Sequence, residues 1–334
     1  MLDLSPHESS FGSSRKAFAA TTSSRRVFVR CAVPGLGLEA TLFNLAREAL
    51  VLRGLADAGL RVPRPLIVSP DGAVVVLEWL DGDVGPCGDP DERERLARKY
   101  VDLIVGVADI DPSTVLASEW SGASTVADAL DLELSRWPSI APPSYFDDVV
   151  ASSLLDWLDE TAPRDPSPST LVHGDAGHGN FLVDGQDVCG LIDWELSHCG
   201  DPLEDIACMQ MRSVGRDAPI WRAAIESSHR DRGTQPDGER LAWERVHVLV
   251  RSAIAMHRSL ERGNEGRAEA PFARFKNENL LLSLREVERL SRRGWTSIPD
   301  LPALVAEGER RCAQAGPASA RVLGAEVAFG YPED

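Results

Sequence analysis

The stretch from residue 171 to residue 205 constrains the fold of this chain most, because it joins strand patterns to a dense group of polar residues. Two short apolar runs, Phe181–Val183 and Val188–Ile192, flank the turn-forming sequence Asp-Gly-Gln-Asp, which predicts a β-hairpin. The polar residues lie in the loop before this hairpin and directly after it: His173, Asp175, Asn180 and Asp193. Since a hairpin brings its strand ends together, we expect these side chains to gather at the open end.

An imidazole, an amide and two carboxylates at one end of a hairpin suit phosphoryl transfer. That reaction needs a carboxylate that takes the proton of an acceptor hydroxyl, together with a metal ion that neutralises charge. Asp175, in a tight polar loop between two strand-like segments, is the candidate base. Asn180 and Asp193 offer the oxygen ligands that Mg²⁺ prefers. The hairpin therefore predicts an Mg²⁺-dependent kinase.

Length and charge limit the classes of protein that remain. A chain of 334 residues is long enough for two domains or one large bilobal domain. The net charge of −17 argues against a nucleic acid or an anionic membrane as partner, and it would suit a cationic substrate, although a solvated surface explains it as well. No apolar run approaches 18 residues, and the N-terminus lacks a signal-peptide pattern, so we expect a cytoplasmic protein.

The first 80 residues alternate strand patterns with one helix. Residues 26–31 form a β-branched and aromatic run, and 73–79 form another. Residues 40–58 carry leucines and alanines at helical spacing. The glycine- and proline-rich segment 81–86 predicts a flexible crossing between lobes.

From about residue 90 the pattern is mostly helical. Helices are expected near 91–110, 124–136, 145–161, 202–213, 217–229, 238–262 and 273–293. Asp201 directly before Pro202 predicts the N-cap of the helix at 202–213, and Trp194 is expected in the core. The predicted class is α+β, with a small β-rich N-lobe and a larger, mainly helical C-lobe. We expect a nucleotide-binding N-lobe over 1–80, a catalytic and substrate-binding C-lobe over 81–295, and a tail over 296–334 with at most one short helix.

Three motifs then point to a known family. They are His-Gly-Asp at 173–175 with Asn180, Ile-Asp-Trp-Glu at 192–195, and Gly-Asp-Pro at 200–202 with Asp205. Together they resemble the aminoglycoside phosphotransferase and choline kinase superfamily, relatives of the protein kinases. The resemblance implies a bilobal protein-kinase-like fold, Asp175 as catalytic base, and Asn180 and Asp193 as ligands of Mg²⁺. It also implies that His173 braces the catalytic loop.

The resemblance further implies a cation on an N-lobe strand, paired with a carboxylate on the following helix. Arg30 and Glu48 fit these positions, and Lys16 is the second candidate for the cation. Arg is longer and planar, so it does not simply replace the Lys that such proteins often carry. The remaining nucleotide contacts would come from a phosphate loop and a hinge: Gly12, Ser13 and Ser14 in the loop, Glu78 and Leu80 in the hinge.

The predicted activity is transfer of the γ-phosphoryl group of ATP, or of GTP, to a hydroxyl group of a small molecule. An aminoglycoside-type antibiotic is the leading acceptor, and the alternative is a hydroxyacyl compound or another metabolite. Two further classes stay open. One is a non-catalytic nucleotide-binding module. The other is a metallohydrolase that would use the histidines at 173, 178 and 198 with Asp175 and Asp193.

Overall fold

The computed structural model describes residues 3–6, 15–21, 25–32, 44–116, 120–213, 217–261 and 269–315. The chain divides into two compact units, each assembled from separate segments. The first unit comprises Met1–Ser121 and Thr170–Cys199, and the second comprises Gly122–Ser169 and Gly200–Asp334. The polar loop and the hairpin thus belong to the same compact unit as the N-terminal strands. The domain boundaries expected after residues 80 and 295 stay predictions.

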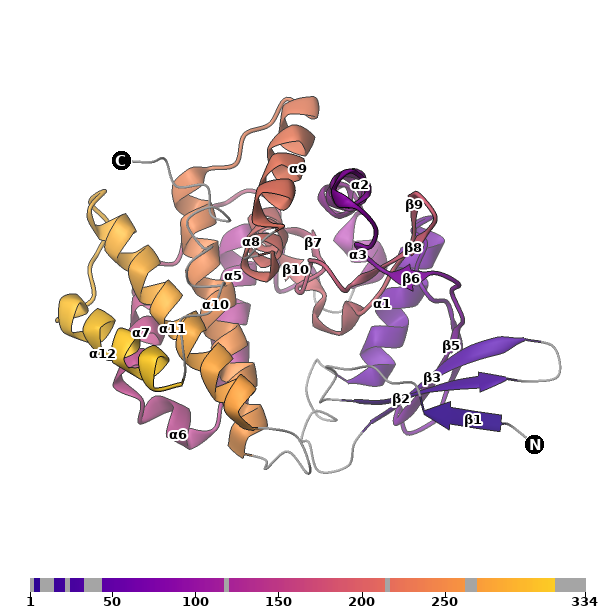
Figure 1. Ribbon diagram of the computed structural model, residues 1–334, viewed down its shortest axis with the longest axis horizontal. Helices are drawn as coiled ribbons and strands as arrows, with labels where there is room; N and C mark the ends of the chain where they lie inside the picture. Colours follow the sequence, from indigo (N-terminus) through magenta and orange to yellow (C-terminus); the bar gives the residue numbers. More distant parts are fainter. Residues whose placement is uncertain are drawn as a thin grey trace. The chain divides into compact units, whose positions relative to one another are not determined.

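A five-stranded antiparallel sheet forms the N-terminal part of the first unit (Figure 1). Its strand order is β1-β2-β3-β5-β4. The strands are β1 (Asp3–Pro6), β2 (Arg15–Thr21), β3 (Arg26–Ala32), β4 (Pro65–Val68) and β5 (Val74–Glu78). In β3 and β5, Arg30 lies opposite Val75, which places this arginine at the centre of the sheet.

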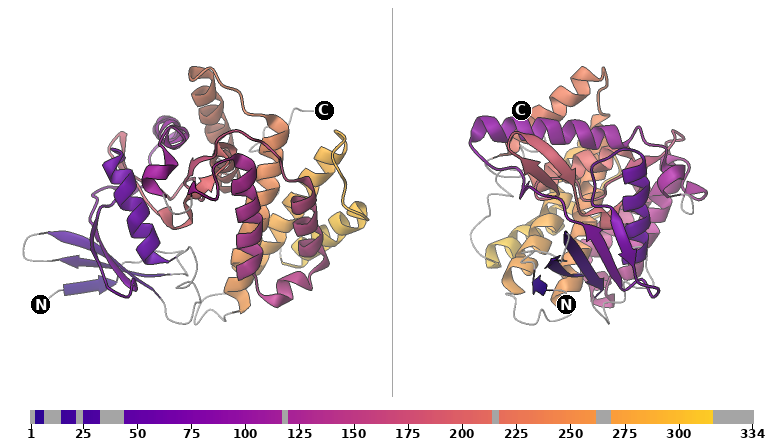
Figure 2. Two further views of the ribbon diagram at one scale, coloured as in Figure 1. Left: turned by 180° about the vertical axis from the view of Figure 1, so that it is seen from behind. Right: turned by 90° about the vertical axis from the view of Figure 1, so that its right-hand side faces the viewer.

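Helix α1 (Leu45–Asp57) packs on β3, β4 and β5 (Figure 2). Asn44 caps its N-terminus, because its side chain accepts a hydrogen bond from the backbone N–H of Arg47 at 2.8 Å. The inward side of the helix carries Leu45, Leu52 and Leu55, which are at most 2% exposed. This periodicity turns Glu48 inward as well, onto the same buried face.

The predicted hairpin is present, formed by β8 (Phe181–Asp184) and β9 (Asp187–Leu191) with Phe181 opposite Leu191. The segment 81–86 differs from expectation. It contains a short strand, β6 (Asp83–Val84), which pairs with β8, so this stretch is bound to the hairpin instead of crossing freely. The other elements of this unit follow: α2 (Pro90–Val107), α3 (Pro112–Val115), β7 (Thr170–Val172) and the 3-10 helix η1 (Trp194–Leu196). Strand β10 (His198–Gly200) pairs with β7.

Helices make up the described part of the second unit. They are α5 (Val126–Ile140), α6 (Pro143–Phe146), α7 (Val149–Thr161), α8 (Pro202–Arg212), α9 (Ala218–Asp231), α10 (Gly238–Glu261), α11 (Glu269–Ser291) and α12 (Leu301–Gln314). Helices α10 and α11 lie side by side (Figure 1). The expected short helix after residue 295 is α12.

Asp201 caps α8, as the order Asp-Pro in the sequence predicts. Its side chain accepts a hydrogen bond from the Leu203 backbone N–H at 2.9 Å, and Pro202 occupies the first helical turn. Asp201 is fully buried and pairs with Arg240 of α10 at 2.8 Å. Burial raises the pKa of Asp201 to about 6, although Arg240 and the Leu203 amide act in the opposite direction.

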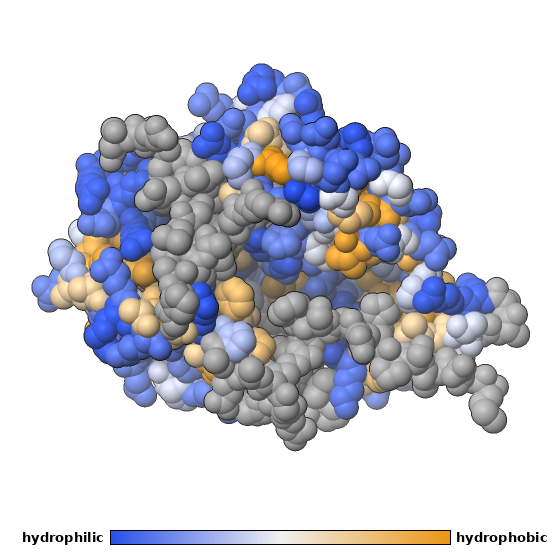
Figure 3. Space-filling view, viewed as in Figure 1, coloured by the Kyte–Doolittle hydropathy of each residue, from blue (hydrophilic) through white to orange (hydrophobic). Residues whose placement is uncertain are grey.

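Hydrophilic residues cover most of the described surface on the face drawn in Figure 3. A surface rich in charged groups matches the net charge of −17. Among the helices of the described residues, none has both the length and the apolar character that crossing a bilayer requires.

Two leucines of α1 test whether this helix anchors the first unit. Leu55 is fully buried, whereas Leu50 on the opposite side is 60% exposed. We expect Leu55→Ala to lower the free energy of unfolding by about 2–5 kcal/mol, because it leaves a cavity. Leu50→Ala is the matched control and should stay within about 0.5 kcal/mol of wild type. Urea unfolding followed by circular dichroism checks both, and equal losses would contradict this packing.

Candidate active site

His173 connects the polar loop to the end of the hairpin. Its ring is fully buried, with Nε2 3.0 Å from the carbonyl oxygen of Ile192. The backbone N–H of Asp175 donates to Nδ1 at 3.3 Å. Because Nδ1 accepts, Nε2 is the nitrogen that donates to Ile192. Trp194 lies against the ring with a centroid distance of 4.4 Å. These contacts hold the loop at His173 next to Ile192, the residue that precedes Asp193.

Gly174 allows the loop to approach η1 closely. Its φ angle is +80°, and a Cβ atom there would lie 2.3 Å from the carbonyl oxygen of Leu196. Only a glycine satisfies both conditions. Further along the loop, the hydroxyl of Tyr100 on α2 accepts a hydrogen bond from the Gly177 N–H at 2.8 Å. This second contact could not be expected from the sequence, since Tyr100 lies 77 residues before Gly177.

Asp175 and Asn180 form one polar unit at the ends of the same loop. The Asn180 Nδ2 group donates to the Asp175 carbonyl oxygen at 2.7 Å and to its Oδ2 at 3.0 Å. The amide nitrogen of Asn180 therefore faces Asp175. The Asn180 carbonyl accepts from the Ile192 N–H at 3.0 Å, so this residue sits beside the hairpin end.

Asp193 leaves the hairpin in a left-handed conformation, with φ +66° and ψ +55°. Few non-glycine residues adopt this conformation, and such positions cluster at functional sites. The turn presents the Asp193 side chain, which is 41% exposed, while Trp194 beside it is buried. As predicted, Trp194 is a core residue.

Arg30 joins the sheet, α1 and the residues after the hairpin. Its guanidinium forms the predicted ion pair with Glu48. It also lies 2.8 Å from Oε2 of Glu195 and 3.4 Å from Oδ1 of Asp193. The sequence predicted the pair with Glu48 but missed the two other contacts, because nothing local relates strand 26–32 to residue 195. Lys16, the second candidate, is exposed on β2.

The four charges of this group shape one another. Burial would lower the pKa of Arg30, but the Glu48, Glu195 and Asp193 carboxylates outweigh it, so the pKa is raised and the guanidinium stays charged. For Glu48, burial is the largest effect and raises its pKa to about 7, with further contributions from Glu195 and Asp193. Arg30 opposes this rise only in part. One guanidinium shared among three carboxylates leaves the most buried one without full compensation.

These side chains fit a divalent cation. When all are ionised, three carboxylates face one guanidinium, so negative charge is in excess within this group. The Asn180 Oδ1 atom and the exposed Asp193 carboxylate offer oxygen ligands, and the backbone bond from Ile192 to Asn180 brings the two residues to the same hairpin end. Oxygen ligands are the kind that a hard ion such as Mg²⁺ prefers.

The other predicted nucleotide contacts stand as follows. Glu78 ends β5, and its N–H already donates to the Arg64 carbonyl at 2.8 Å. The Leu80 side chain is 7% exposed and lies over Gly190 of the hairpin. Gly12, Ser13 and Ser14 lie outside the described residues. The roles of all these residues stay predictions.

Comparison with known proteins identifies the class. The chain belongs to the phosphotransferase enzyme family, which it matches over residues 7–249. The predicted family relationship is therefore confirmed, and the family is one of phosphotransferase enzymes.

Among curated proteins, the chain is 25% identical over 231 residues to acyl-CoA dehydrogenase family member 11 of Pongo abelii, covering 61% of this chain and 29% of that protein. The chain thus spans less than a third of the length of this relative and of the Homo sapiens protein of the same name. It is 28% identical over 247 residues to viomycin phosphotransferase of Streptomyces vinaceus, covering 68% of this chain and 79% of that protein.

Solved structures show the fold. A choline/ethanolamine kinase family protein from Mesorhizobium loti matches with a TM-score of 0.54 and 17% identity, covering 96% of this chain and 93% of the other. A thermostable mutant of aminoglycoside phosphotransferase APH(4)-Ia, in a ternary complex with AMP-PNP and hygromycin B, matches with a TM-score of 0.51 and 19% identity over 85% of this chain and 94% of the other. The predicted α+β, protein-kinase-like fold class is confirmed.

The raised pKa of Glu48 gives a stability test. The folded protein holds a proton on Glu48 more tightly than the unfolded chain does, so this contribution is complete below about pH 4.5 and is lost as the pH rises through about 7. The free energy of unfolding of wild type, relative to Glu48→Gln, should fall over this range by on the order of 3 kcal/mol at most.

Urea unfolding at a series of pH values measures this difference. Glu94→Gln, an exposed position on α2, makes the same substitution as a control and should follow wild type throughout. A difference between wild type and Glu48→Gln that grows with pH would contradict the assigned direction.

Proposed function

We propose that this chain transfers the γ-phosphoryl group of ATP to a hydroxyl group of a small molecule. The observation that carries the proposal is the meeting of Asp175, Asn180 and Asp193 at one hairpin end, beside the Arg30–Glu48 pair. Membership of the phosphotransferase family supports the reaction, and the related structure that contains AMP-PNP supports an adenine nucleotide as donor. GTP stays the alternative donor.

In this proposal Asp175 accepts the proton of the acceptor hydroxyl. Asn180 orients the carboxylate, because its Nδ2 group donates to Oδ2 of Asp175. His173 holds the loop backbone at the N–H of Asp175 and is a positioning residue. The base is thus fixed from two sides before the acceptor arrives, which reduces the reorganisation that the reaction needs.

Asn180 and Asp193 would hold Mg²⁺, which supplies positive charge to the phosphate oxygens when it is bound. Arg30 contributes a fixed charge next to Asp193 and is itself held by Glu48 and Glu195. Since a guanidinium binds oxygens through a planar fork, Arg30 can contact a phosphate while it keeps a carboxylate partner.

Replacement of the base tests the mechanism. We expect Asp175→Asn to lower kcat by about 100- to 10,000-fold, because a carboxamide cannot accept the proton. Nucleotide binding should persist, since this change leaves Arg30 and Asp193 intact. Asp184→Asn, in the exposed hairpin turn, is the matched control and should retain wild-type turnover.

ADP release and isothermal titration with a non-hydrolysable ATP analogue measure the two properties. Wild-type chain that binds nucleotide and never turns it over would indicate a binding module. Hydrolysis of a substrate without ATP would indicate a metallohydrolase. Either outcome, or wild-type kcat in Asp175→Asn, would disprove the kinase mechanism.

We propose a cationic, aminoglycoside-type compound as the acceptor. The similarity to viomycin phosphotransferase and the related structure that contains hygromycin B support this class. The net charge of −17 favours a cationic ligand. A hydroxyacyl compound is the second candidate, because this chain resembles part of the acyl-CoA dehydrogenase family members 10 and 11.

A panel of acceptors distinguishes these two candidates. Aminoglycosides and viomycin should stimulate ADP release, and KM should rise several-fold between about 50 mM and 500 mM salt, because screening weakens long-range attraction. Hydroxyacyl compounds should leave the rate at its basal level. The reverse pattern would transfer the assignment to the hydroxyacyl class while leaving the kinase mechanism intact.

A further inference from the structure

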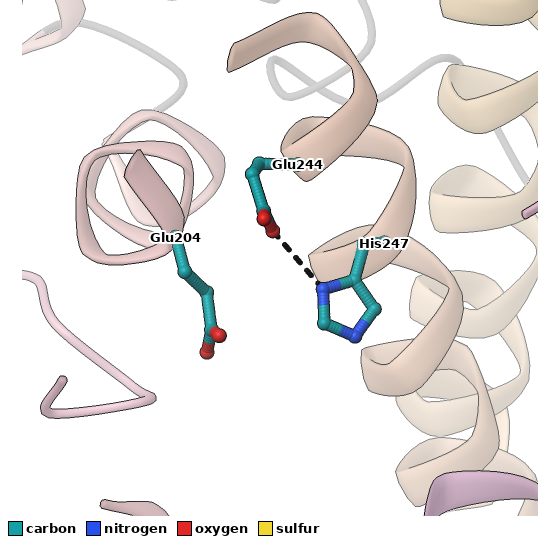
Figure 4. A group of neighbouring side chains, drawn as sticks. All are labelled: Glu204, Glu244 and His247. Atoms are coloured by element: carbon teal, nitrogen blue, oxygen red, sulfur yellow. Dashed lines mark hydrogen bonds and ion pairs between the residues drawn. The ribbon is translucent and has the colours of Figure 1, made fainter. Parts of the chain in front are cut away.

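Three ionisable side chains of the second unit meet in its interior. Glu204 comes from α8, and Glu244 and His247 come from α10 (Figure 4). Each offers one ligand atom, and these atoms lie within 4.8 Å of one another. Glu204 and Glu244 are fully buried, and His247 is 3% exposed. The proposed kinase mechanism uses none of them.

The two carboxylates have different surroundings. Glu204 forms an ion pair with Arg251, which lies about one helical turn beyond His247 on α10. Glu244 is paired with His247 instead. Its Oε2 lies 3.0 Å from Nδ1 of His247, and its Oε1 is buried without a hydrogen-bond partner among the described residues. Figure 4 shows the Glu244 carboxylate directed at the space that it shares with Glu204 and His247.

An unsatisfied buried carboxylate oxygen is costly and calls for an explanation. Burial, with Asp201 and Glu204 nearby, raises the pKa of Glu244 well above its usual range. Arg251 and Arg240 offset this effect only in part. One oxygen of the Glu244 carboxylate thus lies in the interior without a hydrogen-bond partner among the described residues, close to the ligand atoms of Glu204 and His247.

We propose that Glu204, Glu244 and His247 bind a divalent transition-metal cation of the Zn²⁺ class. One imidazole and two carboxylates form a common ligand set for Zn²⁺, whereas Mg²⁺ and Ca²⁺ favour oxygen ligands alone. The cation accounts for the free Oε1 of Glu244, and it gives Glu204 a second charge to face. Arg251 orients the Glu204 carboxylate through their ion pair, as hydrogen-bonded partners of metal-bound carboxylates do.

This site is separate from the proposed Mg²⁺ ligands Asn180 and Asp193, which belong to the other unit. The nature of the ligands distinguishes the two sites experimentally. Co²⁺ with a low coordination number and nitrogen and oxygen ligands absorbs strongly in the visible range. Octahedral Co²⁺ in a site made of oxygen ligands absorbs weakly. Excess Mg²⁺ keeps the oxygen site filled during the titration.

The experiment uses the full chain, stripped with a chelator and dialysed into excess Mg²⁺. We expect one Zn²⁺ per chain by elemental analysis, a visible Co²⁺ band, and a Tm that rises when Zn²⁺ is added. Glu244→Gln and His247→Gln should each weaken Zn²⁺ binding by more than about 100-fold, since loss of a ligand exceeds the effect of losing its hydrogen-bond partner.

Three control variants should retain the Co²⁺ band. Glu239→Gln repeats the first substitution in the first turn of α10, and His229→Gln repeats the second on α9. Asp193→Asn removes the proposed Mg²⁺ ligand. A band that is lost in Asp193→Asn and kept in Glu244→Gln would overturn the proposal.

Wild-type chain that binds no Zn²⁺ would also overturn it, and a proton shared by Glu244 and His247 would then supply the missing charge. This test needs no variant, so it holds even if Glu244→Gln fails to fold. It also leaves the kinase assignment untouched, since phosphoryl transfer is measured separately.

Discussion

The candidate site depends on the contacts that the Arg30 guanidinium makes. The guanidinium joins β3, the helix residue Glu48, and the two acidic residues after the hairpin, Asp193 and Glu195. These residues lie up to 165 positions apart in the sequence. A buried charge is tolerated only with partners, so the sheet, the helix and the hairpin end must assemble together. The contacts of Arg30 therefore hold the fold together and position the candidate site at the same time.

The chain uses arginine far more often than lysine, and this preference determines how many carboxylates residue 30 can contact. Only three of its 35 basic residues are lysines. A lysine ammonium is a compact point charge, whereas a guanidinium can contact several carboxylates in its plane. Arg30 uses this capacity, since one nitrogen contacts Glu48 and Asp193 and another contacts Glu195. The second unit also pairs buried carboxylates with arginines, since Arg240 contacts Asp201 and Arg251 contacts Glu204.

The interior of both units therefore holds acidic groups whose charge is only partly balanced. Glu48 in the first unit and Glu244 in the second have raised pKa values for the same reason, which is burial near other carboxylates. In the first unit the excess of negative charge lies beside an exposed Asp193, where a cation can reach it from solvent. In the second it is fully enclosed and suits a resident cation.

Much of the fold could be predicted because its signals are local. Turn residues between two apolar runs predicted the hairpin, and the order Asp201-Pro202 predicted the cap of α8. Strand β6 was missed, since two residues in a glycine-rich segment carry no periodic pattern. Its pairing with β8 depends on a neighbour about 100 residues away.

By itself, the sequence determined which residues are candidates for the chemistry and in what order they follow one another. Short motifs identified Asp175, Asn180 and Asp193, because loop and hairpin spacing restrict what such residues can do. Only the tertiary structure decided which side chains meet: Glu195 contacts Arg30, Tyr100 binds the Gly177 N–H, and Glu244 lies close to Glu204 and His247. These contacts join distant segments, and electrostatic balance in a buried environment depends on all the charges nearby, which no local pattern contains.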